Sequence, residues 1–344
     1  MQFTKSEIAE FSYIKDVDGY IFISLGVKVA EGEIVCLTYV PDNHGSKSSL
    51  TGERYAKCIF ETDVDSVQLL DVSQTVKDKM RSMIVCNPHT QEQFLVLGYS
   101  KIAYVFSAQE SLSTIMTHQK YLYARPSVQS ALTACDEAGI PREIVGIYGG
   151  IQALLTNPPK LYDVDLVFNG LKYYPNTITL MSQQGYFVNS ELDYADTHEY
   201  KAKVTPRRWE NSFMRIDDET GCDLRICRRS TDRHSYLKMI ARPELADYMS
   251  IEIDKAIVIN ADESLSMCPA YQIQTNNGHT YWVSSLYYCF VGIAKVGDKV
   301  KVKGKQLSKD EIAIFSPNCA EEYIEPIDCD PLGIIEANFA TARV

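Results

Sequence analysis

The sequence has no long apolar run and no closely spaced cysteine pair. No stretch approaches the roughly 20 apolar residues of a membrane helix, and Met1 to Lys5 lack the apolar region of a secretory signal. The ten cysteines stand singly, without a C-x-x-C pair, and the six histidines lie apart from them. These absences argue against a membrane span, a disulfide framework and a zinc site. We therefore expect a cytoplasmic protein with reduced thiols and no membrane partner.

The chain also lacks an excess of positive charge. It carries 34 Lys and Arg against 45 Asp and Glu, a net charge of −11, which argues against a general coating of nucleic acid. Residues 201–242 are the exception, with eleven basic and six acidic side chains. This basic island predicts a site for a triphosphate or for the backbone of an RNA partner. The alternative is a solvated face with internal salt bridges.

Apolar residues are plentiful at 45% of the chain, and aromatic residues reach 10%, which is ample for a folded core. A length of 344 residues predicts more than one domain. We expect an α+β protein with an N-terminal β-rich unit at 1–72, a connecting α/β segment at 73–125, a central core at 126–244 and a C-terminal β-rich unit at 245–344. The short strands of the last unit favour a small β-barrel or OB-like fold.

Local patterns predict individual elements. Residues 20–27 and 33–40 predict a hairpin. Residues 126–138 form the clearest helix, because Pro126 suits its first turn and Gly139 its end. Further helices are expected at 76–85, 108–118 and 175–184, and further strands at 55–60, 93–105, 209–216, 222–228, 251–260, 270–275, 280–290, 299–302 and 311–316.

Three lysines near the end of the chain share one face of a predicted strand. Lys299, Lys301 and Lys303 alternate with Val300 and Val302. Such a face is suited to a nucleic-acid backbone, but alternating lysines also keep an edge strand soluble. The sequence leaves both interpretations open.

Two aspartates alternate with apolar residues in the centre of the chain. The run from Asp163 to Phe168 reads Asp-Val-Asp-Leu-Val-Phe and predicts a buried strand. Residues two apart on a strand point to the same side, so the carboxylates of Asp163 and Asp165 face one point. Carboxylate oxygens suit a hard ion such as Mg²⁺. The two aspartates are therefore predicted ligands of Mg²⁺, with Mn²⁺ as the alternative.

Two glycines precede this strand and predict a phosphate site. Gly149 and Gly150 follow the apolar run 144–148 and precede 151–155, which predicts a strand, a turn and a short helix. Glycines at such a turn let backbone N–H groups approach a phosphate, and the start of a helix adds its positive dipole end. The twelve residues 151–162 connect this turn to the acidic strand.

The hydrophobic-Gly-Gly turn followed by Asp163-x-Asp165 resembles the signature of the DNA-polymerase-β-like nucleotidyltransferase superfamily. The resemblance implies a polymerase-β-like nucleotidyltransferase core, a mixed sheet with helices, and a third acid on a neighbouring strand. Asp223 fits that position, because it lies between apolar residues within 222–226. The nearby Asp217 and Asp218 are the alternatives.

The resemblance extends over most of the chain, to an uncharacterised group of predicted nucleotidyltransferases, although only the central signature is specific. Many members of the superfamily have Ser where this chain has Gly150. The backbone donors of the turn are kept, but a hydroxyl suited to contacting a phosphate is lost. The segments that carry the wider resemblance are 18–22, 39–41, 52–55, 298–305 and 323–326.

The resemblance implies a reaction. A nucleoside monophosphate passes from an NTP, with ATP favoured, to a hydroxyl acceptor, and pyrophosphate is released. Asp163, Asp165 and Asp223 would be the catalytic and metal-binding residues. RNA such as tRNA is the favoured acceptor, a protein side chain or small molecule is an alternative, and a partner protein is left open.

Basic residues near the acids complete the predicted site. Arg225 and Arg228 are expected to contact the triphosphate or the acceptor, and Lys160 is a weaker candidate. Two other functions remain open from the sequence. A catalytically decayed core would act as a nucleotide-binding or RNA-binding regulatory module, which needs only the glycine turn and the basic island. A structural partner in a larger complex would tolerate substitution of the acids.

Overall fold

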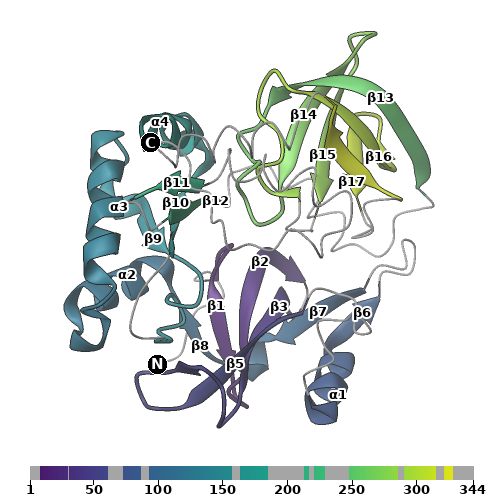
Figure 1. Cartoon of the computed structure of the whole chain (residues 1–344). Coiled ribbons are helices and arrows are strands. Elements are labelled where there is room, and N and C mark those ends of the chain that lie inside the picture. The colour runs from purple at the N-terminus through teal and green to yellow at the C-terminus, as the bar shows by residue number, and fades with distance from the viewer. Residues whose placement is uncertain are drawn as a thin grey trace.

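Figure 1 shows a computed structural model of the chain, which describes residues 8–29, 31–60, 73–86, 93–156, 163–184, 213–216, 221–228, 248–285, 290–314 and 321–327. Within these residues the fold is mixed α+β and consists mostly of strands, arranged in a curled N-terminal sheet, a central sheet and a closed barrel. No helix in the described part is both long and apolar enough to cross a membrane.

The N-terminal sheet runs in the order β4-β5-β3-β2-β1-β8, with β7 beside β3 and β6 beside β7. The antiparallel pair β2–β3 confirms the predicted hairpin. The predicted boundary at residue 72 falls within this sheet, because strands from both sides of it pair with one another. The bounds are β1 (Tyr13–Asp16), β2 (Ile21–Val29), β3 (Gly32–Pro41), β4 (Lys47–Ser48), β5 (Arg54–Phe60), β6 (Ile84–Cys86), β7 (Gln93–Gly98) and β8 (Ile102–Phe106).

The described residues include four α-helices, each within two residues of its predicted bounds. Ser73 caps α1 by accepting a hydrogen bond from the Val76 N–H, and Ser107 caps α2 in the same way. In α3, Pro126 lies in the first turn and Gly139 follows the end with a φ of +71°. The bounds are α1 (Gln74–Met83), α2 (Ala108–Thr117), α3 (Arg125–Glu137) and α4 (Tyr174–Gln184), with 3-10 turns η3 (Tyr99–Lys101), η4 (Gln119–Tyr121), η5 (Arg142–Ile144) and η6 (Leu171–Tyr173).

The central sheet has the order β11-β12-β10-β9. Strands β10 and β12 are parallel, whereas β9 and β11 pair antiparallel with their neighbours. The predicted strand at the aspartates is present, and strands also lie within the predicted ranges 209–216 and 222–228, where they pair antiparallel. The bounds are β9 (Val145–Ile147), β10 (Asp163–Asn169), β11 (Phe213–Arg215) and β12 (Gly221–Cys227).

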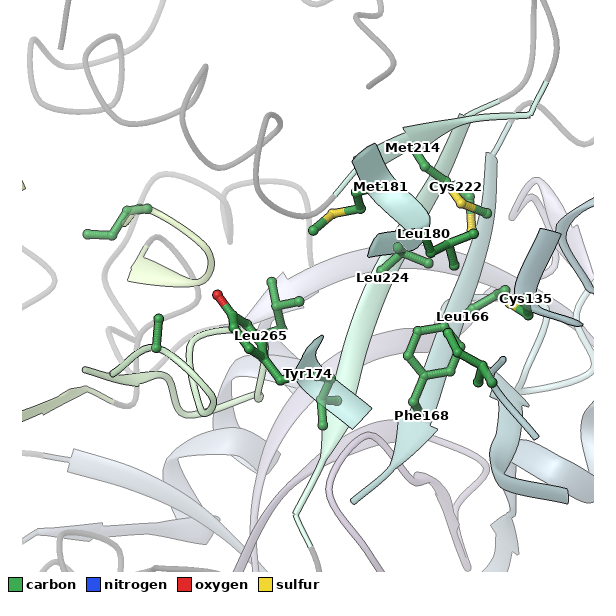
Figure 2. Close-up of a cluster of buried hydrophobic side chains, with 14 of the residues drawn as sticks. Cys135, Leu166, Phe168, Tyr174, Leu180, Met181, Met214, Cys222, Leu224 and Leu265 are labelled. Atoms are coloured by element: carbon green, nitrogen blue, oxygen red, sulfur yellow. The ribbon is translucent and has the colours of Figure 1, made fainter. Parts of the chain in front are cut away.

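One face of the central sheet is covered by α3 and α4 (Figure 1). Figure 2 shows Leu166 and Phe168 of β10 beside Leu224 of β12, with Leu180 of α4 and Cys135 of α3 packed over them. All five of these side chains are fully buried. Alternate residues of a strand point to opposite sides, so Leu166, Phe168 and Leu224 lie on the face that the helices cover. The other face therefore carries Asp165 and Asp223.

The C-terminal unit is a closed five-stranded barrel, as the sequence predicted for a small barrel. Its order is β13-β14-β15-β17-β16, and pairing between β13 and β16 closes it. Strands β15 and β17 run parallel, and β18 pairs antiparallel with residues 300–303 of β16. The bounds are β13 (Met249–Asn260), β14 (Ala270–Thr275), β15 (Thr280–Ser285), β16 (Lys299–Ser308), β17 (Glu311–Ile314) and β18 (Tyr323–Pro326).

The three units meet in one buried apolar cluster. Phe11 and Leu25 come from the N-terminal unit, Tyr148 and Cys227 from the central unit, and Met267 from the C-terminal unit. The ring centroids of Phe11 and Tyr148 are 5.3 Å apart. The face of the central sheet that carries the aspartates thus borders both β-rich units.

The helix expected at 151–155 is not present, and this prediction was wrong. The segment forms successive turns, in which the Gln152 N–H donates to the Gly149 carbonyl and the Leu154 N–H to the Ile151 carbonyl, each at 3.0 Å. Leu154 has a φ of +55°, which ends any helical path. Five residues are also too few to offset the cost of helix nucleation. A helix dipole therefore makes no contribution at the glycine turn.

The single strand expected at 93–105 is divided into β7 and β8 by the 3-10 turn η3. The two strands then join different neighbours, since β7 pairs with β3 and β8 with β1. The division lets one continuous segment supply strands on both sides of the β2–β3 hairpin.

Candidate active site

Two of the predicted acids lie at paired positions of neighbouring parallel strands. Asp165 on β10 pairs with Asp223 on β12, so their side chains share one face of the sheet. Asp163 pairs with Gly221 in the same register, while its side chain lies outside the described part. The strand expected to carry a third acid is thus beside the strand of the first two.

The carboxylate of Asp223 has two partners on the same face. The Tyr148 hydroxyl donates a hydrogen bond to Oδ2, and Nη1 of Arg225 lies 2.5 Å from Oδ1. The guanidinium carbon of Arg225 is 5.9 Å from the centroid of the Tyr148 ring. Asp223 is 3% exposed and Arg225 is fully buried, so this group is an interior ion pair that orients one carboxylate.

Gly149 is fitted to Asp165 in two respects. Its φ of +80° is in the left-handed region that favours glycine. In addition, a Cβ at position 149 would overlap the carboxylate of Asp165. The glycine turn and the acidic strand are therefore in direct contact, and a side chain at position 149 would displace the carboxylate.

Gly150 is fitted to a residue of the N-terminal sheet. A Cβ at position 150 would overlap the hydroxyl of Tyr39 on β3. Tyr39 is 2% exposed. The two glycines of the turn thus leave room for two different side chains, Asp165 on one side and Tyr39 on the other.

The segment after the glycines is held by contacts with three other elements. Thr156 forms a β-bridge with Ser48, in which each backbone N–H donates to the other carbonyl at 2.8 and 3.2 Å. The side-chain amide of Gln152 donates to the Phe106 carbonyl at 2.9 Å, and the Ser111 hydroxyl donates to the Gln152 carbonyl at 2.7 Å. These contacts hold the segment in place without a helix.

Arg228 lies in an interior ion-pair network that joins the three units. Its Nη1 contacts Glu10, its Nε is 2.8 Å from Glu263, and its Nη2 donates to the Cys268 carbonyl. Burial disfavours the charged guanidinium, but the two carboxylates outweigh it and hold the Arg228 pKa above its usual value. The positions of Arg225 and Arg228 do not support the prediction that they contact a triphosphate, because both guanidinium groups are buried against carboxylates.

Several predicted residues lie outside the described part of the chain. These are Lys160, Asp217 and Asp218, together with most of the basic island at 201–242. Arg215 of that island is described and is exposed on β11. The predicted role of the island stays a prediction.

The lysines of β16 face acids and polar groups on the outside of the barrel. Lys301 pairs across the sheet with Glu325, Lys303 is 3.8 Å from Glu252, and Lys305 donates to Ser250 at 2.8 Å. Neighbouring acids offset much of the positive charge that a nucleic-acid backbone would need. The arrangement favours a role of these lysines in keeping the strand soluble.

The chemistry of the paired acids fits a hard divalent cation, because their ligand atoms are carboxylate oxygens. Asp165 and Asp223 supply two such groups on one face of the sheet. Within the residues that the structure describes, no group of three or more His, Cys, Asp or Glu side chains is placed to hold a metal ion. The fit therefore rests on these two side chains and on the position of Asp163 in β10.

Comparisons with known proteins found no match, either among protein-family models or among curated proteins or solved structures. The function is therefore argued from the geometry of the site.

Two site residues were missed from the sequence. Tyr148 could have been found, since it precedes Gly149 and lies beside Asp165 when β9 and β10 are paired. Tyr39 gives no local signal of its contact with Gly150, because its strand is distant in sequence and only the packing of the N-terminal sheet brings it to the turn.

Proposed function

We propose that the chain is a metal-dependent nucleotidyltransferase, built on a polymerase-β-like core with an OB-like barrel. It transfers a nucleoside monophosphate from an NTP to a hydroxyl acceptor. The observation that carries the proposal is the pairing of Asp165 with Asp223 beside a glycine turn that Asp165 contacts. The sequence of elements also supports it, since α3, β9, the turn, β10, α4 and the β11–β12 hairpin follow one another along the chain.

Each group of residues in the site has its own role in this reaction. Asp163, Asp165 and Asp223 would hold Mg²⁺ or Mn²⁺, and the bound ion would offset triphosphate charge and lower the pKa of the acceptor hydroxyl. Tyr148 and Arg225 orient Asp223. The backbone N–H groups at Gly149 and Gly150 bind phosphate oxygens.

The transfer itself exchanges one phosphorus–oxygen bond for another. The acceptor oxygen forms a bond to the α-phosphorus, and the bond from the α-phosphorus to the oxygen bridging to the β-phosphate breaks. Pyrophosphate carries away the electron pair of that bond. The proton of the acceptor hydroxyl passes to a carboxylate of the acidic group.

Label transfer tests the proposal. The native chain is incubated with each α-³²P-labelled NTP, Mg²⁺ or Mn²⁺, and cellular RNA and protein. Asp165→Asn removes one carboxylate of the pair, and Asp254→Asn makes the same change at an exposed position on β13 of the barrel. We expect label on an acceptor with the native chain and the Asp254 variant only. Equal labelling by the Asp165 variant, or none by the native chain, would contradict the reaction.

A second candidate is a regulatory module that binds an NTP or RNA without transferring it. It is favoured by the engagement of Asp223, whose carboxylate is already held by Arg225 and Tyr148. In this case the native chain binds NTP but labels no acceptor. The Asp165→Asn variant would then keep the native affinity for NTP in the absence of metal, as measured by titration calorimetry.

A further inference from the structure

The glycine at position 150 is needed for space and not for its backbone conformation. Among the described glycines, Gly149 has a positive φ, whereas Gly150 does not. A side chain on residue 150 would begin at the Tyr39 hydroxyl, and the ring carbon that bears this hydroxyl is 3.3 Å from the same point. A hydroxyl therefore lies where a side chain of residue 150 would lie, but this hydroxyl belongs to Tyr39 of β3.

Tyr39 is held firmly in this position. Its ring packs in a buried cluster with Tyr13, Tyr55 and Leu155, and its ring centroid is 6.3 Å from that of Tyr13. Its backbone lies within β3, between Ile21 of β2 and Lys57 of β5. Leu155 belongs to the segment that follows the glycines, so the same cluster fixes both the tyrosine and the turn.

We propose that Tyr39 is a nucleotide-positioning residue, whose hydroxyl donates a hydrogen bond to the triphosphate of the NTP at the Gly149–Gly150 turn. A phenol keeps its proton at neutral pH and is an uncharged donor. A phosphate oxygen is a charged acceptor, and such hydrogen bonds are among the stronger ones. The inference rests on the proposed function. It adds that the N-terminal sheet supplies part of the nucleotide site.

Three variants test the role of the hydroxyl. Tyr39→Phe removes it and leaves the ring, while Gly150→Ser adds a side chain that overlaps it. The double variant removes the overlap with the hydroxyl, leaves the Tyr39 ring carbon 3.3 Å from the added Cβ, and returns a hydroxyl to the turn on residue 150. Tyr13→Phe is the matched control, since it removes a hydroxyl from the same buried cluster. Calorimetry measures the Kd for Mg²⁺-ATP, and thermal melting measures stability.

We expect Tyr39→Phe to weaken binding by about tenfold or more, the usual loss for a hydrogen bond to a charged group. Tyr13→Phe keeps the native Kd. Gly150→Ser alone lowers both affinity and melting temperature, and the double variant recovers most of the affinity. Because Tyr39→Phe and Tyr13→Phe remove the same group from the same cluster, similar melting temperatures exclude a general loss of structure.

The outcomes separate this inference from the reaction on which it rests. Native affinity in Tyr39→Phe overturns the role of the hydroxyl, even when label transfer is intact. If the native chain labels no acceptor but Tyr39→Phe weakens NTP binding, the role of Tyr39 is supported and the transferase is overturned. A native chain that binds no NTP overturns both.

Discussion

Asp165 and Asp223 lie opposite each other on two parallel strands, with the guanidinium of Arg225 against the second carboxylate. Two like charges at paired strand positions repel. The cation of Arg225 reduces this repulsion by pairing with Asp223. The arrangement is typical of a site at which function is retained at the expense of stability.

The first prediction is that Asp165→Asn separates activity from stability. The change removes one of two neighbouring negative charges, so we expect the melting temperature to stay the same or rise. Label transfer should fall by at least about a hundredfold, the usual effect of losing an essential electrostatic group. Thermal melting and label transfer on the same preparation check both parts. A variant that melts lower than Asp254→Asn would contradict the expected repulsion.

The second prediction concerns the partner of Asp223. Arg225→Met keeps much of the side-chain volume but leaves a buried carboxylate without its ion pair. We expect the free energy of unfolding to fall by about 3 to 5 kcal/mol, measured by urea titration. Arg142→Met breaks an exposed ion pair with Asp136 and serves as the control, for which little change is expected. Equal losses of unfolding free energy in the two variants would show that the buried ion pair stabilises the fold no more than the exposed one.

The third prediction concerns the network around Arg228. Arg228→Met leaves the buried carboxylates of Glu10 and Glu263 without their shared cation. We expect the free energy of unfolding to fall by about 3 to 5 kcal/mol. Replacing Glu10 and Glu263 by Gln in the same chain should recover part of it, because no buried charge is then left unpaired. The exposed pair of Lys303 and Glu252 is the control. No recovery in the triple variant would contradict the assignment of the loss to unpaired charge.

The fourth prediction is a dependence of stability on pH. Glu33 on β3 is fully buried, and burial raises its pKa from 4.5 to about 8, against the opposing effects of Lys28 and Ser24. Between these values the folded chain holds a proton that the unfolded chain releases. This contribution to stability is therefore complete below about pH 4.5 and is lost as the pH rises through about 8.

Glu33→Gln should remove this dependence. The difference in the free energy of unfolding between the native chain and the variant should change by up to about 1.4 kcal/mol per pH unit between the two pKa values of Glu33. Urea titrations at about pH 5.5, 6.5 and 7.5 measure it. Glu31→Gln changes an exposed neighbour on the same hairpin and should follow the native chain. Parallel profiles for the native chain and Glu33→Gln would show that the carboxyl is already ionised in the fold.

Elements whose pattern is complete within a few residues could be predicted from the sequence. Helix α3 has its proline, its apolar stripe and its closing glycine within one stretch, and strand β10 shows its alternation over a single run. The hairpins of the barrel are similar, since their turn residues lie between the strands they join. In these cases local preference and packing agree.

What could not be predicted depends on residues that are distant in sequence. Residues 151–155 have a helical composition, but Ser48 and Tyr121 hold the segment in turns. Arg228 is one of many basic residues in its segment, and nothing beside it in sequence indicates that Glu10 and Glu263 enclose it. The location of Tyr39 over Gly150 follows from the packing of a whole sheet, which no pattern within β3 records.

The alternation of residues along β12 constrains how this chain can change in evolution. Asp223 and Arg225 lie on the face with Asp165, while Cys222 and Leu224 lie under the helices. Inserting or deleting one residue within the strand would move both sets to the wrong faces. Related sequences should therefore differ in length between the strands, while the spacing from Asp223 to Arg225 stays constant even where the residues themselves are replaced.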